Sequence, residues 1–441
     1  MIHRKDSEYG QAIYLIGFAL VAMLGVMALA IDGGRVYADR RKAQNTADTA
    51  SFAGGLVIAQ ADKGDPTNLP AGTFTQASAK AFERAISNRY NDSNPYVDVS
   101  VSIPETPLFE DGSYYYLVRV EITSRLDGMF TSLVYQGQLA NTVYAVAKVN
   151  PIQGLAFGNS LYANAPDECN AMHFTGTVDV RIVDGGIFSN SNADENNCPS
   201  MHRRGDGDVE VANGGIGSVG SFRNSGSSGS ITPPPDTGLL QESLPDLPVP
   251  DCGGLTDFGS VVINPGTMVA LEPGIYDGIE IRGASGNPTN VTMKSGMYCI
   301  TNDGFEVSGA TVFGKDVFFY MGGGDFLVTA SSFVHLSAAT NLYDASSNNW
   351  SGMLVYMPIS NHGTVTITGT SGSYFGGTIY APGPVSPSSK AKCTVIGTGE
   401  VLTLNSQIIC YTIEIGGDGK INMRYDANAN FKLGSKMSQQ E

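Results

Sequence analysis

The sequence predicts a membrane-anchored chain of mixed α+β and then all-β structure. We expect an N-terminal transmembrane helix that extends past the membrane, a small α+β unit, and a C-terminal parallel β-helix. Residues 12–31 are uncharged throughout, short strand patterns separated by turn residues dominate from about residue 155, and a six-residue motif recurs after 22 positions. These three observations predict the anchor, the all-β class and the repeat architecture, respectively.

The apolar run Ala12–Ile31 is long enough to cross a bilayer. At about 1.5 Å per residue, a helix of this length spans roughly 30 Å, the thickness of the hydrocarbon core. A secretory signal peptide has a shorter apolar segment, of about 7–15 residues, and a cleavage site of small residues, so we expect an uncleaved anchor. Basic residues at 3–5 favour a cytoplasmic tail over residues 1–11 and export of the rest, although a second basic cluster at 35–42 opposes this assignment.

Composition limits the classes of partner. The 441 residues carry a net charge of −16, which disfavours nucleic acid as a partner and a broad basic face lying on anionic lipid. Charged residues make up only 15% of the chain and glycine is abundant, with 54 residues. Low charge combined with many turn residues favours a β-rich body over a helical one.

The helical pattern continues beyond the apolar run, so we assign residues 12–60 to one transmembrane and extended helix. Small residues recur three, four or seven positions apart and form a stripe that allows close packing: Val36, Ala43, Ala47, Ala50 and Ala53. The pair Gly54–Gly55 is expected to weaken or end the helix.

Residues 61–150 predict a juxtamembrane α+β unit. A loop is expected at 61–72 and an amphipathic helix at 76–90, followed by alternating strand patterns at 97–101, 114–123 and 142–149.

The remaining chain divides by composition into four parts. We expect a first β-rich part at 151–223, a Gly/Ser/Pro-rich loop or linker at 224–252, a β-helix domain at 253–430 and a polar tail at 431–441. The motif Leu271–Tyr276 recurs as Met293–Tyr298, each copy following a short strand. A fixed period with short strands is typical of a solenoid, here a parallel β-helix, and the alternative is a β-sandwich.

The six cysteines all follow residue 168. An even number in an exported region favours disulfides in an oxidising compartment over redox or zinc chemistry. Six cysteines allow fifteen pairings, and proximity along the chain favours Cys169–Cys198, Cys252–Cys299 and Cys393–Cys410.

The candidate catalytic acids lack partner motifs. Asp184, Asp303, Asp316 and Asp325 lie beside or near glycine, which favours turn capping over catalysis. The segment Asp206–Asp208 with Glu210 resembles the start of a calcium loop but has the wrong spacing, and no two histidines have metal-ligand spacing. We therefore expect no cofactor, no metal and no enzyme activity.

The N-terminal segment resembles the TadE/TadG-like family, which is associated with Flp (tight-adherence) pilus assembly. The residues that carry the resemblance lie before the apolar run, at its end and in the helix beyond it: Gly10, Gln11, Asp32, Gly33, Gly34, Arg35, Tyr37, Gln44, Asn45, Ala47 and Asp48. The resemblance implies a single-pass bacterial membrane protein whose partners are membrane lipid and the pilus or secretion machinery. Packing of the anchor helix as in pilins would add a homo-oligomer or filament.

Two family features are missing here. An Asp-x-Ser-x-Ser metal motif, found in members with a von Willebrand A-like domain, does not occur. The fifth residue after Gly10 is Leu15, where processed prepilins carry glutamate, so we do not expect cleavage there. We therefore expect a structural envelope protein that acts in pilus assembly, adhesion or surface-layer formation. The alternatives are an anchored enzyme acting on envelope polysaccharide and a glycan- or peptide-binding module, for which an exposed Trp350 would be the sign.

Overall fold

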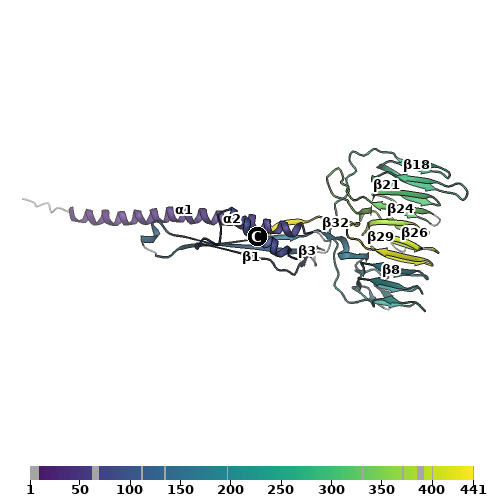
Figure 1. Ribbon diagram of the computed structural model, residues 1–441, viewed down its shortest axis with the longest axis horizontal. Coiled ribbons are helices and arrows are strands. Elements are labelled where there is room, and N and C mark those ends of the chain that lie inside the picture. The colour runs from purple at the N-terminus through teal and green to yellow at the C-terminus, as the bar shows by residue number, and fades with distance from the viewer. Residues whose placement is uncertain are drawn as a thin grey trace, which may run out of the picture. The chain divides into compact units, whose positions relative to one another are not determined.

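The computed structural model describes residues 9–61, 69–110, 113–133, 136–195, 197–329, 332–369, 372–384, 392–399 and 401–440. The chain forms two compact units (Figure 1). Unit 1 contains the described residues of 9–110, 114–152 and 434–440, and unit 2 contains those of 153–433. Unit 2 is thus inserted between two strands of unit 1.

Unit 1 consists of two helices and an antiparallel sheet. The helices are α1 (Tyr9–Ala59) and α2 (Thr73–Ser87), and a short 3₁₀ turn, η1 (Thr131–Leu133), follows the third strand. The sheet has the order β1-β3-β4-β33, with β2 paired to β3. Its strands are β1 (Val97–Ser102), β2 (Leu108–Glu110), β3 (Ser113–Leu126), β4 (Leu139–Asn150) and β33 (Lys436–Gln440).

The small-residue stripe of α1 forms its packing face, as predicted. Ala43, Ala47 and Ala50 are fully buried, in one cluster with α2 and the inward side chains of β1, β3 and β4. Gly54 and Gly55 do not end α1, which continues to Ala59. A Cβ at Gly54 would lie 2.9 Å from the carbonyl oxygen of Ala77 in α2, and one at Gly55 would lie 2.8 Å from Val149 Cγ2 in β4. The two glycines therefore allow close approach to both neighbours.

The polar tail expected at residues 431–441 contains two strands instead. Residues 432–433 form β32 (Lys432–Leu433), which pairs with β5 (Gln153–Gly154) inside unit 2. The second strand, β33, returns to unit 1 and pairs antiparallel with β4, where Met437 packs against the core. The segment is polar because β33 lies at the edge of the sheet, where most of its side chains are exposed.

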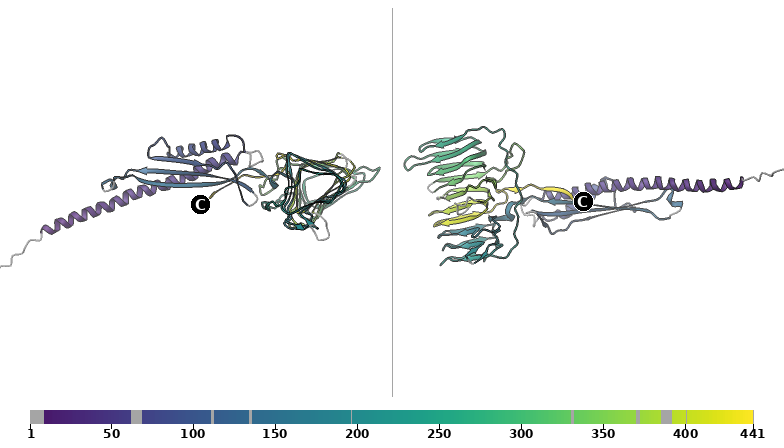
Figure 2. Two further views of the ribbon diagram at one scale, coloured as in Figure 1. Left: turned by 90° about the horizontal axis from the view of Figure 1, so that it is seen from below. Right: turned by 180° about the vertical axis from the view of Figure 1, so that it is seen from behind.

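The described part of unit 2 forms a 24-stranded sheet in which the paired strands run parallel. Its strands stack in three ladders, A, B and C, and the left view of Figure 2 shows them along three sides of a closed outline. Ladder A contains β17 (Ser260–Ile263), β19 (Gly274–Arg282), β21 (Gly296–Ser308), β23 (Phe326–Val328), β26 (Val365–Gly369), β28 (Cys393–Gly397), β30 (Ile413–Gly417), β7 (Met172–Phe174), β12 (Met201–Arg203) and β15 (Phe222–Asn224).

The other two ladders share several long strands. Ladder B contains β18 (Met268–Leu271), β20 (Asn290–Met293), β22 (Thr311–Met321), β24 (Phe333–Ala338), β27 (Tyr374–Ala381), β29 (Val401–Cys410), β31 (Lys420–Arg424), β8 (Asp179–Val183), β13 (Val209–Ala212) and β16 (Ile231–Thr232). Ladder C contains parts of β19, β21, β22, β27 and β29, with β25 (Met353–Tyr356), β6 (Asn159–Ala163), β9 (Gly186–Ser189) and β14 (Ile216–Ser218). A separate short pair is β10 (Asp194–Glu195) with β11 (Cys198–Pro199), and η2 (Leu155–Gly158) precedes β6.

The stacking order in unit 2 is not the order of the sequence. The last strands of the later run, β29, β30 and β31, pair with the first strands of the earlier run, β6, β7 and β8. Residues 233–259, which we name the return segment, therefore connect one end of the stack (β16) to the other (β17). The predicted parts 151–223 and 253–430 thus share one sheet, because parallel ladders continue across their junction.

The predicted linker at 224–252 packs on unit 2. Tyr162 and Asn190 hydrogen-bond to the backbone of Glu242, and leucines of the return segment pack on buried residues. The two copies of the repeated motif lie on successive rungs, since β19 pairs with β21 and the rings of Tyr276 and Tyr298 stack 6.1 Å apart.

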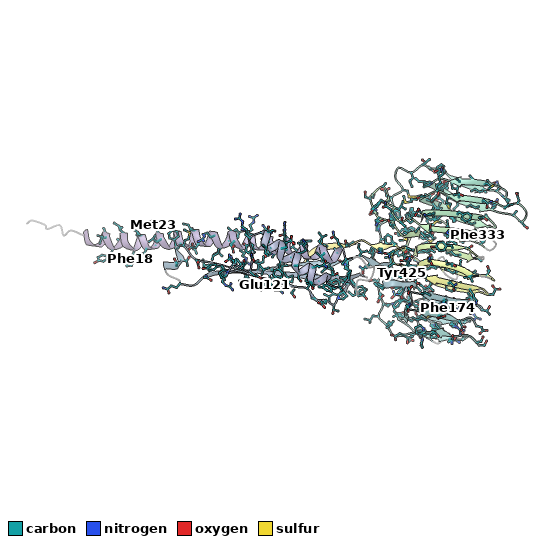
Figure 3. All side chains as sticks on the ribbon, viewed as in Figure 1. Phe18, Met23, Glu121, Phe174, Phe333 and Tyr425 are labelled. Carbon is teal, nitrogen blue, oxygen red and sulfur yellow. A yellow bond between two sulfur atoms is a disulfide. The ribbon has the colours of Figure 1, made fainter. Side chains whose placement is uncertain are left out.

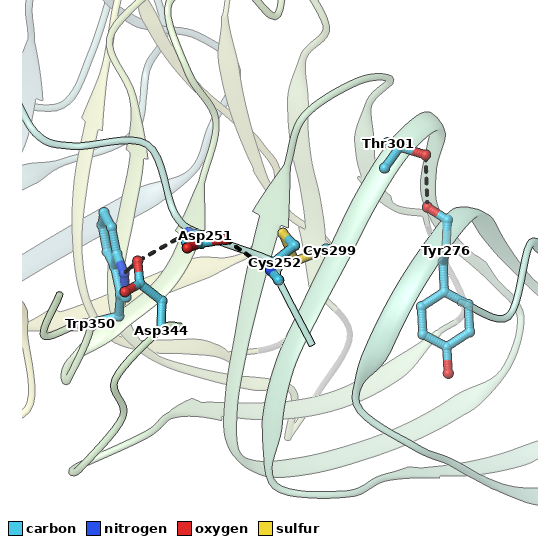
Figure 4. The surroundings of a disulfide bond; sticks show 8 residues. Asp251, Cys252, Tyr276, Cys299, Thr301, Asp344 and Trp350 are labelled. Atoms are coloured by element: carbon cyan, nitrogen blue, oxygen red, sulfur yellow. Dashed lines mark hydrogen bonds between the residues drawn. A yellow bond between two sulfur atoms is a disulfide. The ribbon is translucent and has the colours of Figure 1, made fainter. Parts of the chain in front are cut away.

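The disulfides pair as predicted from proximity: Cys169–Cys198, Cys252–Cys299 and Cys393–Cys410. Figure 4 shows the second, which ties the end of the return segment to β21. Beside it the carboxylate of Asp344 accepts hydrogen bonds from the indole of Trp350 (2.9 Å) and the backbone N–H of Asp251 (3.0 Å).

Candidate functional site: the sheet-facing side of α1

The N-terminal part of α1 exposes apolar side chains. Within the described residues, α1 is the helix that is long and apolar enough to cross a membrane, judged by length and composition. Phe18 is 76% exposed and Met23 is 60% exposed, and both project from α1 in Figure 3. Side chains of this size and exposure need an apolar surrounding, which a bilayer provides.

Asp32, the first charged residue after the apolar run, is buried against the turn between β3 and β4. Its carboxylate accepts hydrogen bonds from the backbone N–H groups of Met129 (2.9 Å), Phe130 (2.9 Å) and Thr131 (2.7 Å). The hydroxyl of Thr131 donates a fourth, at 2.6 Å. Hydrogen bonds to a charged acceptor are the strong ones, so Asp32 fixes this turn on α1.

Arg35 lies one turn further along α1 and contacts the same turn of the sheet. Its guanidinium donates to the backbone carbonyl of Asp127 at 3.2 Å and lies 3.7 Å from the Asp32 carboxylate. Arg35 thereby extends the contact and remains 42% exposed at its side chain.

Asp39 makes a second contact of the same kind, which sequence reasoning missed. It accepts hydrogen bonds from the Tyr90 hydroxyl (3.0 Å), from Asn141 Nδ2 (3.3 Å) and from the Ser124 hydroxyl. Its spacing from Asp32, seven residues or about two turns, places both aspartates on the helix face that meets the sheet. That spacing is the signal that could have revealed it.

A third contact joins α1 to the edge of the sheet. The side-chain amide of Gln44 donates to Asp48 Oδ1 (2.9 Å) and to the backbone carbonyl of Tyr144 (3.0 Å). Gln439 of β33 donates to the same Asp48 oxygen at 2.5 Å. Gln44 and Asp48 were singled out by the family resemblance, whereas Gln439 lies in the segment expected to be a tail.

The other residues of the resemblance have different surroundings. Ala47 is buried in the helix packing and Asn45 is half-buried, whereas Tyr37 is 71% exposed. A Cβ added at Gly33 or Gly34 would meet no atom within 4 Å. Gly10 and Gln11 lie in the first turns of α1. The structure thus assigns a contact role to Asp32, Arg35, Gln44, Ala47 and Asp48.

The four candidate catalytic acids lie on different strands and connections of unit 2. Asp184 accepts from Asn213 and lies 3.4 Å from Arg424, and Asp325 accepts from the backbone N–H of Thr364. Asp303 lies in β21, and Asp316 in β22 has a positive φ of 58°. Among the described residues there is no group of three or more His, Cys, Asp or Glu side chains that could hold a metal.

The acids of the calcium-like segment hold the serines of the next coil. Asp206 accepts from the N–H groups of Ser227 and Ser228, and Asp208 accepts from Ser230. Hydrogen bonds from backbone and hydroxyl groups of these serines lower the pKa of both carboxyls. Glu210 lies 3.8 Å from Arg181. These side chains stabilise turns between rungs.

Trp350 is buried, so it does not give the exposed aromatic expected of a binding module. Its ring stacks on Phe318 at 5.3 Å and its N–H is bonded to Asp344. Burial of Asp344 acts to raise the pKa of its carboxyl, but hydrogen bonds from Trp350, Asn348 and the backbone of Asp251 lower it to about 2.

The observations define a protein with one candidate membrane helix, whose sheet-facing side carries the recognisable residues, and a large body of parallel β-strands. Residues 10–61 match a family model described as putative Flp pilus-assembly TadE/G-like, which confirms the resemblance over this segment. No curated protein and no solved structure matches the chain. The matched residues end two residues after α1, so the family match covers the helix and its contacts.

Proposed function

We propose that this chain is a non-enzymatic structural component of a Flp-type pilus-assembly or surface-adhesion apparatus. In this proposal α1 anchors the chain in the cytoplasmic membrane with its N-terminus in the cytoplasm, and both units lie outside the cytoplasm. Unit 2 is a parallel β-helix that serves as a rigid projecting element.

The observation that carries the proposal is the match at residues 10–61 together with what those residues do in unit 1. Asp32, Gln44 and Asp48 bind the sheet through hydrogen bonds, so the matched segment is both the candidate anchor and the scaffold of unit 1. A single helix that continues from an apolar run into a packed unit transmits position from the membrane to the ectodomain without a flexible joint.

The β-helix assignment is supported by the three parallel ladders and by the inward aromatic stack of Phe258, Tyr276, Tyr298 and Phe319. Each rung buries its inner face against its neighbours, as in solenoid proteins. The three disulfides support an oxidising compartment for unit 2. The non-enzymatic role is supported by the structural partners of Asp184, Asp206, Asp208 and Asp325.

The test has two parts, carried out in the native bacterium. Alkaline phosphatase fused after residue 440 should be active, since the enzyme folds only outside the cytoplasm, whereas a fusion in place of residues 32–441 reports the anchor alone. Deletion of the gene should remove surface pili from electron micrographs, and the full chain supplied from a plasmid should restore them. Normal pili in the deletion strain would contradict the role in assembly, and an inactive full-length fusion would contradict the orientation.

A further inference from the structure

We propose that the turn at residues 127–133, between β3 and β4, is a second membrane contact, which places Met129 and Phe130 in the interfacial region of the bilayer beside α1. We name this segment the membrane turn. The inference rests on the proposed anchoring by α1 and adds a protein surface that binds lipid.

The first argument is position along α1. Ile31 ends the apolar run, and the next residue, Asp32, receives the N–H groups of residues 129–131 at 2.7–2.9 Å. The backbone of the membrane turn is therefore held at the level where the apolar run ends. Figure 1 shows the end of the β3–β4 hairpin beside the N-terminal half of α1.

The second argument is that part of the apolar run is covered on one side. Leu24 is 37% exposed and Ile31 is 42% exposed, whereas Phe18 and Leu29 are 76% and 78% exposed. Leu24 and Asp32 are two turns apart and lie on one helix face. The lower exposure therefore occurs on the face that carries the membrane turn, which indicates that the turn reaches back along the run.

The third argument is the chemistry of the membrane turn. Met129 is 62% exposed, and Phe130 beside it is half-buried. An exposed apolar side chain in water is unfavourable by roughly 25 cal/mol per Å², but one next to the end of a membrane span meets the headgroup–acyl boundary. Aromatic and large apolar residues are typical of that depth.

Local charge also fits a lipid surface, despite the net negative charge of the chain. Arg35 is bonded to the membrane turn through the carbonyl of Asp127 and keeps its guanidinium partly exposed. Arg40 and Arg41 are exposed within the next two turns of α1. Basic side chains beside apolar ones match the phosphates and acyl chains of an anionic bilayer surface. The occupant we infer is therefore lipid, and a second copy of this chain is the competing outcome.

The test uses the full chain in lipid vesicles that contain anionic lipid, with bromine atoms near the headgroups or deep in the acyl chains. Bromine quenches tryptophan on contact, and the native Trp350 is buried in unit 2 and gives a constant background. The reporter variants are Met129→Trp in the membrane turn, Leu20→Trp in the apolar run and Phe109→Trp as a matched exposed control. Phe109 precedes β3, whose twelve residues from 114 to 126 place it about 40 Å from the membrane turn.

We expect shallow bromine to quench the Met129→Trp variant with a blue shift of its emission, deep bromine to quench Leu20→Trp, and neither to quench Phe109→Trp. Adding Asp32→Ala should release the turn and reduce quenching at position 129 while leaving position 20 unchanged. Quenching at 20 without quenching at 129 would overturn this inference and leave the anchor in place. A blue shift at 129 that depends on protein concentration, without quenching, would indicate contact between copies and also overturn it. No quenching at either position would overturn the anchor itself.

Discussion

The carboxylate of Asp32 accepts hydrogen bonds from both the N–H group and the hydroxyl of Thr131, 99 positions further along the chain. One residue of the matched segment thus ties the candidate membrane helix to the far turn of the sheet. Asp39 and Asp48 repeat the arrangement at later turns of α1, toward Ser124 and Gln439. The polar residues of this helix therefore register the sheet on α1, and the alanines between them supply the close packing.

Replacing Asp32 should loosen the membrane turn without unfolding unit 1. The variant Asp32→Ala removes the acceptor of three backbone N–H groups, so their amide exchange should accelerate by roughly tenfold or more. Hydrogen exchange of the full chain in detergent, followed by mass spectrometry, measures this at residues 129–131. The control is Asp98→Asn, which breaks an exposed ion pair with Arg125 and should leave these amides unchanged. Equal exchange in Asp32→Ala and the parent chain would show that the carboxylate does not hold the turn.

Two glycines of α1 should respond to alanine in opposite ways. Gly54→Ala places a Cβ 2.9 Å from the backbone carbonyl of Ala77, and relief of this contact should cost about 1–3 kcal/mol of unfolding free energy. Gly34→Ala meets open space and should be neutral or stabilising by up to about 1 kcal/mol, since alanine favours the helix. Urea unfolding followed by exchange of α1 amides in unit 1 compares the two variants. A stabilising Gly54→Ala would mean that α1 and α2 can separate at no cost.

Local patterns predicted much of unit 1 and failed where distant segments pair. The alanine stripe, the helix at 73–87 and three strands follow from periodicity that neighbouring residues carry. The pairing of β33 with β4 does not, because the strand is short, polar and about 290 residues from its partner. Resemblance singled out Asp32, but its partners are backbone N–H groups, which leave no mark on side-chain identity.

In unit 2 the same limit separates what was predicted from what was not. The repeat at Tyr276 and Tyr298 predicts neighbouring rungs, since the two copies adjoin along the chain, and short sequence distance also identified the three disulfides. The junction of β29 with β6 joins residues such as Ile408 and Leu161, and no local pattern specifies which two ends of a stack meet. The return segment was taken for a linker because it is rich in proline and glycine, although its leucines pack on the body.

Removing the disulfide Cys252–Cys299 should release the return segment. The double variant Cys252→Ser with Cys299→Ser frees a loop of 47 residues, and the entropy of that loop corresponds to about 4 kcal/mol of stability in the chain-entropy model. Limited proteolysis should then cut between residues 233 and 252, where the parent chain resists. The matched control, Cys393→Ser with Cys410→Ser, opens a loop of 17 residues and should lower stability by about 3 kcal/mol without exposing this segment. Resistance of the first variant to cleavage would show that packing and the Asp251–Asp344 hydrogen bond suffice.

A stacked histidine pair in ladder A should make unit 2 less stable in acid. His173 and His202 lie on neighbouring rungs with ring centroids 5.2 Å apart, between Glu414 on one side and Arg223 on the other. Burial, then the nearby His173, Arg223 and Arg204, lower the pKa of His202 to about 4, and burial and Arg204 lower that of His173. His173 Nε2 has no hydrogen-bond partner among the described residues, which also favours its neutral form.

The sign of the pH effect follows from proton binding. Between the unfolded pKa of 6.5 and the folded pKa of about 4, the unfolded chain binds more protons than the folded one, so stability falls as pH decreases through this window. His202 is partly exposed and solvent screens its charge, so we expect a loss on the order of 1 kcal/mol. Urea unfolding followed by fluorescence of Trp350, the single tryptophan, measures it from pH 7 to pH 4. The variant His202→Gln should flatten the pH dependence relative to the parent chain, whereas His362→Gln, at an exposed position, should not. Identical slopes for all three proteins would mean that other groups, such as the carboxylates, account for the acid sensitivity of unit 2.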